Sequence, residues 1–134
     1  MSERIIPAAM QPVYDKWHFA PAVRVDRTLY LSGLMGTEPD STVNKDPKTQ
    51  FNRMFTTMEL ILAEAGCTIN DVVEMTSFHL NLAETFAAFS AVKDARVPEP
   101  HPAWTAIGVH SLLLPGALVE VKAVARIPDS PTTG

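Results

Sequence analysis

The stretch from Pro98 to Arg126 limits the possible folds of this chain more than any other segment. Prolines at positions 98, 100 and 102 rule out regular structure before Ala103, because proline fits neither a helix interior nor a central strand. An apolar strand from Ala103 to Val109 follows, and a turn at Pro115-Gly116 leads into a second strand, Leu118 to Ile127. The segment therefore predicts two strands near the end of the chain, joined by a loop.

The last of these strands has two distinct faces. Its small and branched apolar residues alternate along the strand, so that one face packs against a core. These residues are Val119, Val121, Ala123, Ala125 and Ile127. The opposite face carries charges, among them Glu120, but Leu118 and Val124 make it too apolar for a face exposed only to water. We interpret this second face as a subunit interface that embeds a few charges.

Upstream, the strongest pattern predicts a helix from Pro47 to Ala65. Asp46 can cap its first turn, proline suits the first helical position, and Gly66 can close the helix in a left-handed conformation. Apolar residues recur at three- and four-residue spacing and give one buried stripe. They are Phe51, Met54, Phe55, Met58, Ile61, Leu62 and Ala65.

A second, weaker helix is predicted from Ala83 to Asp94, with Phe86 and Phe89 on its buried side. Three further strands are predicted from segments dense in β-forming residues or flanking a hairpin-length connection. They are Ala22 to Val25, Thr28 to Ser32 and Val72 to Leu80. The order ββαβαββ predicts an α+β domain, with a mixed sheet that carries both helices on one face.

Composition bounds the size and class of the protein. With 134 residues, 46% of them hydrophobic and 19% charged, the chain is typical of one soluble globular domain, which we assign to residues 1–127. The remaining segment, Pro128 to Gly134, has two prolines and no large apolar side chain. We therefore expect a flexible C-terminal tail.

Charge and cysteine content bear on partners and compartment. The net charge is −4, and the 11 lysines and arginines form no basic run, so we expect no nucleic-acid surface. A single cysteine, Cys67, excludes an internal disulfide and fits a reducing compartment. No apolar run reaches the length of a signal peptide or a membrane span. These features favour a cytoplasmic protein that does not enter a membrane.

Two motifs resemble a known family. Residues Thr28 to Gly33 read TLYLSG, and the segment from Pro98 reads PEPHPAWTAIGVHSLLLPGALVEVKAVAR. At this separation, the two motifs together resemble the RidA family, also called YjgF-like or endoribonuclease L-PSP. The resemblance implies the chorismate-mutase-like α+β fold and a homotrimer in which three sheets pack into a central barrel. It also implies that a small-molecule ligand binds in a cleft between subunits.

The resemblance places candidate site residues at the end of one motif and within the other. Glu120 stands where the family has a glutamate that orients or activates a water, and is the candidate catalytic residue. Ser32 and Gly33 are candidate substrate-binding residues, because glycine lets the backbone bend away from the sheet and the serine hydroxyl can face a ligand. Two structural alternatives stay open. Glu120 could form an interface ion pair with Lys122, with Arg126 or with an arginine of a neighbouring subunit, and Ser-Gly is common wherever a strand enters a loop.

Four other family positions have changed in this chain. The family loop reads Pro-Ala-Arg-Thr/Ser, and its arginine grips a substrate carboxylate at two points; here that residue is Trp104. Phe19 replaces a tyrosine, Ser90 an asparagine and Ala106 a cysteine. We interpret these residues as substrate-binding positions of a more apolar pocket, which suits a neutral or aromatic substrate stacking on Trp104. The alternative is that these positions no longer form a ligand pocket and that their side chains only pack against one another.

The histidines give no metal signature. His18, His79, His101 and His110 lack metal-ligand spacing, and we expect neither a metal nor another cofactor. His18 adjoins Phe19, and His101 lies close to Trp104, so either could supply a proton or a hydrogen bond near neutral pH. We include His101 among the candidate substrate-binding residues. The alternative for both is a loop histidine that faces water.

Three functions fit these residues. The first is an enzyme that hydrolyses a reactive imine or enamine, or catalyses a related hydration or deamination, at a cleft between subunits, with Glu120 serving a water. Without the arginine, it would differ from a typical 2-iminobutanoate/2-iminopropanoate deaminase in its substrate. The second is a non-catalytic small-molecule binder or sensor that uses the same cleft. The third is an endoribonuclease, against which the acidic chain and the missing basic stripe argue.

Overall fold

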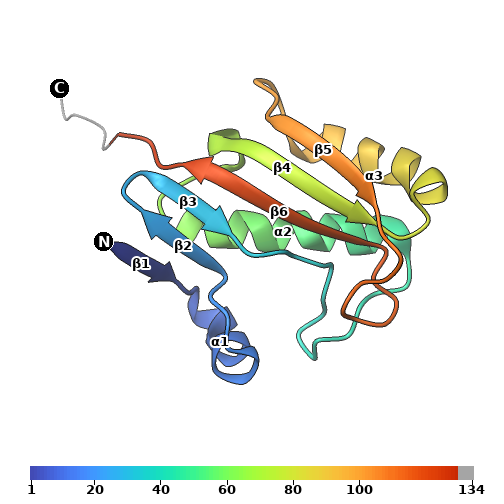
Figure 1. The fold of residues 1–134 in the computed structure, drawn as a ribbon, viewed down its shortest axis with the longest axis horizontal. Coiled ribbons are helices and arrows are strands. Elements are labelled where there is room, and N and C mark those ends of the chain that lie inside the picture. Colours follow the sequence, from blue (N-terminus) through green and yellow to red (C-terminus); the bar gives the residue numbers. More distant parts are fainter. Residues whose placement is uncertain (130–134) are drawn as a thin grey trace.

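The computed structural model describes residues 1–129, so residues 130–134 of the predicted flexible tail lie outside the described residues. Six strands and three α-helices follow one another along the chain (Figure 1). They are β1 (Ser2–Ile5), α1 (Gln11–Trp17), β2 (Ala22–Val25), β3 (Thr28–Leu31), α2 (Pro47–Glu64), β4 (Val72–His79), α3 (Leu82–Arg96), β5 (Ala103–Gly108) and β6 (Val119–Arg126). Two short 3₁₀ turns, Ala8–Met10 and Ile69–Asp71, precede α1 and β4.

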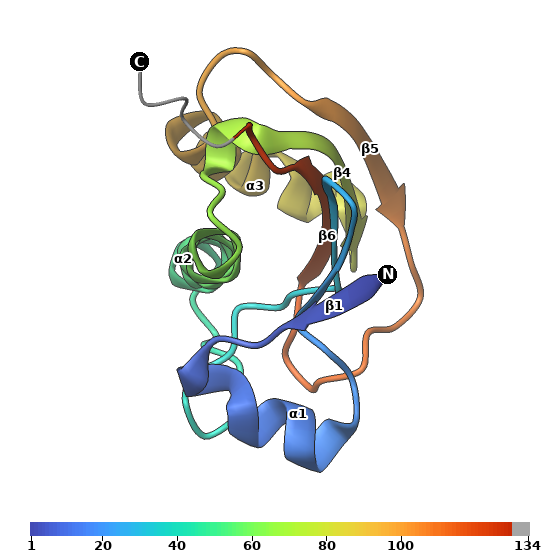
Figure 2. The ribbon, with the colours of Figure 1, turned by 90° about the vertical axis from the view of Figure 1, so that its left-hand side faces the viewer.

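The strands form one sheet in the order β1-β2-β3-β6-β4-β5. Every neighbouring pair is antiparallel except β4 and β5, which are parallel, so the sheet is mixed as predicted. The helices α2 and α3 cover one face of it, and α1 lies at one end of this layer (Figure 2). The predicted order ββαβαββ is confirmed, and β1 and α1 precede it as elements that the sequence analysis missed.

Helix α2 forms for the reasons that its sequence indicates. The carboxylate of Asp46 accepts a hydrogen bond from the backbone N–H of Thr49, 3.0 Å away, and Pro47 occupies the first turn. Gly66 follows the helix with φ +78°, a conformation that glycine adopts without strain. Gln50 is buried, and its amide joins Asn44, Gly116 and Leu118 through three hydrogen bonds. This one side chain therefore fixes two loops to the start of β6.

Helix α3 differs from its prediction in one respect. Phe89 is buried as expected and packs edge-on against Phe51, with ring centroids 5.5 Å apart. Phe86, which was predicted on the same buried side, is 39% exposed and stacks on a tryptophan of β5 instead. The reason is that β5 is the outermost strand of the sheet, so the outer part of α3 has no further strand to cover it.

The two faces of β6 agree with the alternation of its sequence. Val119, Val121, Ala123, Ala125 and Ile127 are all buried in the core. On the other face Glu120 and Val124 are half-buried, while Lys122 and Arg126 are exposed. Leu118 was predicted on this second face, but it precedes the strand and packs against the core. No helix of the described part of the chain covers the second face (Figure 2).

Candidate functional site

The end of β3 brings Gly33 against the side chain of Glu120. Tyr30 pairs with Val124, and Leu34 bridges to Val121. Between these two pairs, residues 31–33 lie opposite only residues 122–123 of β6. A Cβ placed on Gly33 would lie 2.8 Å from Glu120 Cδ and overlap its carboxylate. Only glycine therefore leaves room for the carboxylate at this irregularity of the sheet.

The Glu120 carboxylate is not neutralised by its own strand. The structure records no ion pair between it and Lys122 or Arg126, and no side chain of residues 1–129 donates a hydrogen bond to it. The structural alternative of a pairing within β6 is thus not realised in one chain. The carboxylate keeps its capacity to accept hydrogen bonds from a water or a ligand.

Ser32 has a positioning role. Its hydroxyl donates a 2.7 Å hydrogen bond to the carbonyl of Ala20, and its backbone N–H donates to the carbonyl of Pro21. These two bonds fix the segment between α1 and β2 beside the end of β3. That segment holds Phe19, which follows His18, a residue of left-handed conformation (φ 60°) that ends α1.

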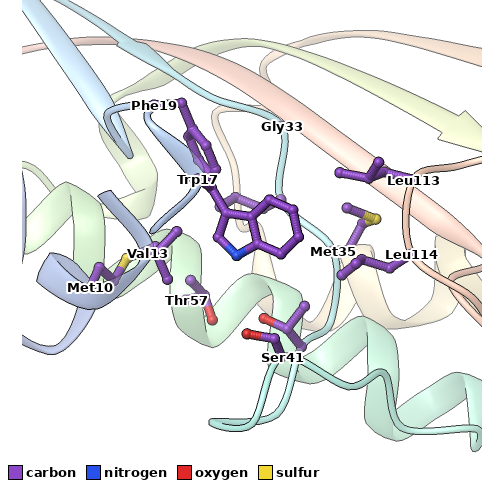
Figure 3. A pocket seen from close by; sticks show the side chains of 12 residues that line it. Met10, Val13, Trp17, Phe19, Gly33, Met35, Ser41, Thr57, Leu113 and Leu114 are labelled. Carbon is purple, nitrogen blue, oxygen red and sulfur yellow. The ribbon is translucent and has the colours of Figure 1, made fainter. Parts of the chain in front are cut away.

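A cavity of about 110 Å³ lies beside Gly33 and Phe19. Its walls come from α1, the loop after β3, α2 and the loop between β5 and β6 (Figure 3). The lining residues are Met10, Val13, Trp17, Phe19, Gly33, Leu34, Met35, Thr37, Ser41, Thr57, Leu113 and Leu114. None of these side chains carries a charge. Of the residues that the sequence analysis assigned to an apolar pocket, Phe19 lines this cavity, whereas Trp104, Ser90 and Ala106 do not.

Trp104 lies elsewhere. It pairs in register with the buried Met75, so its side chain points to the helix-covered face of the sheet. Its ring stacks on Phe86 with centroids 5.5 Å apart and planes 5° from parallel, and the Lys93 ammonium lies 4.5 Å from its centroid. Phe86 and Lys93 lie two turns apart on α3, so both of these contacts to the indole come from the same helix.

The indole nitrogen of Trp104 is also engaged. It donates a 2.8 Å hydrogen bond to Ser77 Oγ, which lies 2.8 Å from His79 Nε2. His79 Nδ1 in turn lies 3.3 Å from the hydroxyl of Thr85. Ser77 and His79 are fully buried, and burial lowers the pKa of His79 below its usual value of 6.5. The network thus joins β5, β4 and α3 inside the core.

The other predicted residues near Trp104 also belong to this edge of the sheet. Ser90 lies on the same side of α3 as Phe86 and Lys93, four residues after the first and three before the second. Ala106, on β5, pairs with Ser77 of β4. His101 precedes β5 and is exposed, with Nε2 3.9 Å from a Glu99 carboxylate oxygen. His18 is exposed as well. Among the described residues no three His, Cys, Asp or Glu side chains converge as a metal site would require.

The candidate site residues therefore form two groups. Phe19, Ser32, Gly33 and Glu120 surround the end of β3, whereas Ser90, His101, Trp104 and Ala106 lie at the edge formed by β5 and α3. Strands β6 and β4 separate β3 from β5, a distance of about 14 Å at the usual strand spacing. Trp104 and Glu120 also point to opposite faces of the sheet. One chain does not bring the two groups together around a small ligand.

Sequence reasoning missed the residues that α1 and the loops contribute to the cavity. Met10, Val13 and Trp17 lie at spacings of three and four along the segment that becomes α1. This spacing and the proline early in the segment were the available signals. Leu113 is 74% exposed and follows the apolar strand in sequence, so nothing distinguished it from a loop residue.

The family is shown by comparison with known proteins. The family model described as endoribonuclease L-PSP matches residues 10–127, and the chain belongs to this family, which is also called RidA or YjgF. The RutC family protein YjgH of Escherichia coli K12 is 34% identical over 126 residues, which cover 93% of this chain and 95% of that protein. A solved structure of protein YjgH aligns with a TM-score of 0.86 and 32% identity, over 96% of this chain and 98% of that one.

Some relatives are named for an activity. A 2-iminobutanoate/2-iminopropanoate deaminase of the mite Dermatophagoides farinae is 30% identical over 129 residues, which cover 93% of this chain and 97% of the deaminase. The fold, a mixed sheet with helices on one face, agrees with these relatives. In residues 1–129, no helix has the length and apolar character needed to cross a membrane.

Proposed function

We propose that this protein binds a small molecule in a cleft between subunits and hydrolyses a C=N bond there. The observation that carries the proposal is the Glu120 carboxylate, seated on Gly33 without an ion pair to its own strand. The two groups of candidate residues lie on different strands, and Glu120 and Trp104 point to opposite faces of the sheet, so a site that uses both groups would require a subunit boundary. The family resemblance supports a homotrimer as the assembly.

In this proposal Glu120 holds a water and accepts one of its protons as the oxygen attacks the imine carbon. That proton then passes to the nitrogen and gives a carbinolamine. A second proton moves from the new hydroxyl group to the nitrogen as the C–N bond breaks, and a carbonyl compound and an amine or ammonia leave. A carboxylate within hydrogen-bonding reach of a water is suited to this general base role. Ser32 acts indirectly, because its hydroxyl fixes the Phe19 segment rather than facing the carboxylate.

The proposed substrate lacks a carboxylate anchor. Trp104 offers no charge, its ring stacks on Phe86 and its indole nitrogen already donates to Ser77. Lys93 brings a cation close to this position, but its ammonium lies over the indole ring and 3.6 Å from the Asp94 carboxylate. A single lysine so placed does not reproduce the two-point fork of an arginine. A neutral imine or enamine therefore fits better than an amino-acid-derived one.

The assembly can be tested through Val124, which is half-buried on the sheet face opposite the helices and pairs with the exposed Tyr30. Replacing Val124 by glutamate would bury an unpaired carboxylate at the proposed interface. Light scattering at micromolar concentration should find a trimer for the wild-type protein and smaller species for the variant. A monomeric wild-type protein would contradict the proposed assembly.

The catalytic role can be tested by replacing Glu120 with glutamine. An enzyme should lose turnover of a neutral imine by about 100-fold or more, on the order of what a general base contributes, and should keep its ligand affinity. The matched control is Glu64→Gln, a change of an exposed carboxylate on α2. If Glu120→Gln leaves both turnover and binding as they were, the alternative of a non-catalytic binder or sensor replaces this proposal.

A further inference from the structure

The cavity between α1 and α2 is a candidate binding site in its own right, separate from Glu120. We call it the α1 pocket and define it by Val13, Trp17, Met35, Thr57 and Leu113 with their neighbours in the lining (Figure 3). Glu120 does not line it, although the pocket shares Phe19 and Gly33 with the group of candidate residues around Glu120. The pocket is formed by a single chain, whereas the proposed hydrolytic cleft needs two.

The α1 pocket is apolar with polar groups at one end. The side chains of Met35, Leu113 and Leu114 form one side, and the indole nitrogen of Trp17 points towards the side of Thr57 and Ser41 (Figure 3). Within residues 1–129 no hydrogen bond engages the Trp17 nitrogen, the Ser41 hydroxyl or the Thr57 hydroxyl. These groups provide one fixed donor and two hydroxyls that can either donate or accept.

The wall near the polar end has a constrained backbone. Ser41 adopts φ +69°, which is uncommon for a residue other than glycine. It lies in a small hairpin closed by the bridge between Thr37 and Val43, and an ion pair between Glu38 and Arg53 fixes this hairpin to α2. The backbone that carries Ser41 is therefore held in place before a ligand arrives, which reduces the ordering cost of binding.

The opposite wall is loosely held. Helix α1 has seven residues and none of them is buried, and Trp17 is 44% exposed. A short helix with few buried contacts opens at low free-energy cost, so α1 can admit a ligand and close on it. A ligand that fills the pocket would in turn stabilise α1, because its apolar residues would gain contacts they lack.

Size and lining define the ligand. An apolar cavity of about 150 Å³ in another protein takes up benzene, so a cavity of about 110 Å³ is suited to one six-membered ring. The uncharged lining excludes a carboxylate, a phosphate or an ammonium, since none of them would find a counterion. We propose that the α1 pocket binds a neutral molecule of single-ring size that carries one hydroxyl or carbonyl group.

The experiment uses 4-fluorophenol as the probe and follows its ¹⁹F signal in the presence of the full-length protein at pH 7. We expect saturable binding, and at least about 10-fold weaker binding of 4-fluorobenzoate, whose charge the pocket cannot compensate. Equal affinity for the two probes, or no saturable binding of the phenol, would overturn the proposal.

Three variants locate the probe. Thr57→Val keeps the shape and removes the hydroxyl, and should weaken binding about 3- to 10-fold. The control Thr56→Val removes a hydroxyl from the same turn of α2 outside the pocket, where Arg96 contacts it, and should leave the affinity unchanged. Val13→Phe should fill the pocket and abolish binding while the circular dichroism of the protein stays the same. The site would be refuted if Thr57→Val and Thr56→Val had the same affinity for 4-fluorophenol. It would also be refuted if Val13→Phe bound the probe as tightly as the wild-type protein.

A final arm separates this site from the proposed hydrolytic cleft. Glu120→Gln should not change the affinity for 4-fluorophenol, because Glu120 is not part of the lining. A loss of phenol binding in that variant would place the probe at the Glu120 cleft and overturn the separate pocket. The pocket stands even if Glu120→Gln proves that the protein has no hydrolytic activity.

Discussion

The indole nitrogen of Trp104 donates its hydrogen to Ser77 Oγ across the parallel pair of β5 and β4, at 2.8 Å. Ser77 also lies 2.8 Å from His79 Nε2, so the tryptophan extends a buried polar network into the edge strand. The hydrogen bond gives Trp104 a stabilising contact with the core.

We expect Trp104→Phe to lower the free energy of unfolding by about 1–2 kcal/mol. The new ring can still stack on Phe86, but the hydrogen bond to Ser77 is lost. The control is Trp17→Phe, which makes the same change at an indole whose nitrogen has no hydrogen bond among the described residues. It should cost about 0.5 kcal/mol or less. Urea unfolding of both variants measures the difference, and equal costs would contradict the structural role of Trp104.

His79 should make the stability depend on pH. Burial lowers its pKa in the folded protein below 6.5, so the unfolded chain binds this proton at a higher pH than the folded one. The stabilising contribution is therefore present above pH 6.5 and is lost as the pH falls towards the lower, folded-state pKa. Urea unfolding at pH 7.5 and 5.5 should show this loss, and His79→Gln should reduce it. His110→Gln, a change in an exposed loop, should leave it intact.

The contact between Gly33 and Glu120 can be measured as a coupling free energy. Gly33→Ala should destabilise the protein by about 1–3 kcal/mol, because its Cβ would overlap the carboxylate. Glu120→Ala in the same chain should recover most of this loss. Gly66→Ala is the control, since its φ of +78° makes alanine unfavourable by about 1 kcal/mol although nothing lies within 4 Å. Coupling between Gly66→Ala and Glu120→Ala equal to that of Gly33→Ala would refute a direct contact.

Local signals predicted most of the fold. The cap at Asp46, the turn at Gly66 and the alternation along β6 depend on neighbours in sequence, and all three are confirmed. Strand β1 and helix α1 were missed because they are short and expose most of their residues, so hydrophobic periodicity is weak in both. Ile5 is the only buried residue of β1.

The candidate site was predicted less completely, because its geometry depends on strand register. TLYLSG and Glu120 came from sequence motifs, and the structure brings Gly33 and Glu120 into contact. The direction of the Trp104 side chain follows from its pairing with Met75, which no local pattern reveals. The stacking of Phe86 and Lys93 on the indole needs the packing of α3 against β5 as well.

The last prediction concerns 2-aminoacrylate-type imines, which this protein should hydrolyse slowly. The missing arginine removes a charge-assisted pair with the substrate carboxylate, a loss of about 2–5 kcal/mol, or roughly 30- to 4,000-fold in affinity. We expect Trp104→Arg to restore little of the activity. The new guanidinium would replace an indole that stacks on Phe86 and lies 4.5 Å from the Lys93 ammonium, so it would meet a like charge and lose the ring stacking.

The neighbouring positions also lead us to expect little recovery of activity in Trp104→Arg, because catalytic groups act as a unit rather than additively. Ser90 and Ala106 lack the amide and thiol that accompany the arginine in the family, so a single substitution does not rebuild the site. A coupled assay tests this: an amino-acid oxidase or a dehydratase generates the imine, a trapping reagent reports what remains, and the rate is compared with and without protein. If the wild-type protein accelerates the loss of imine as much as an arginine-bearing relative does, then Glu120 and the backbone suffice for the reaction, and the replacement of the arginine by Trp104 does not limit it.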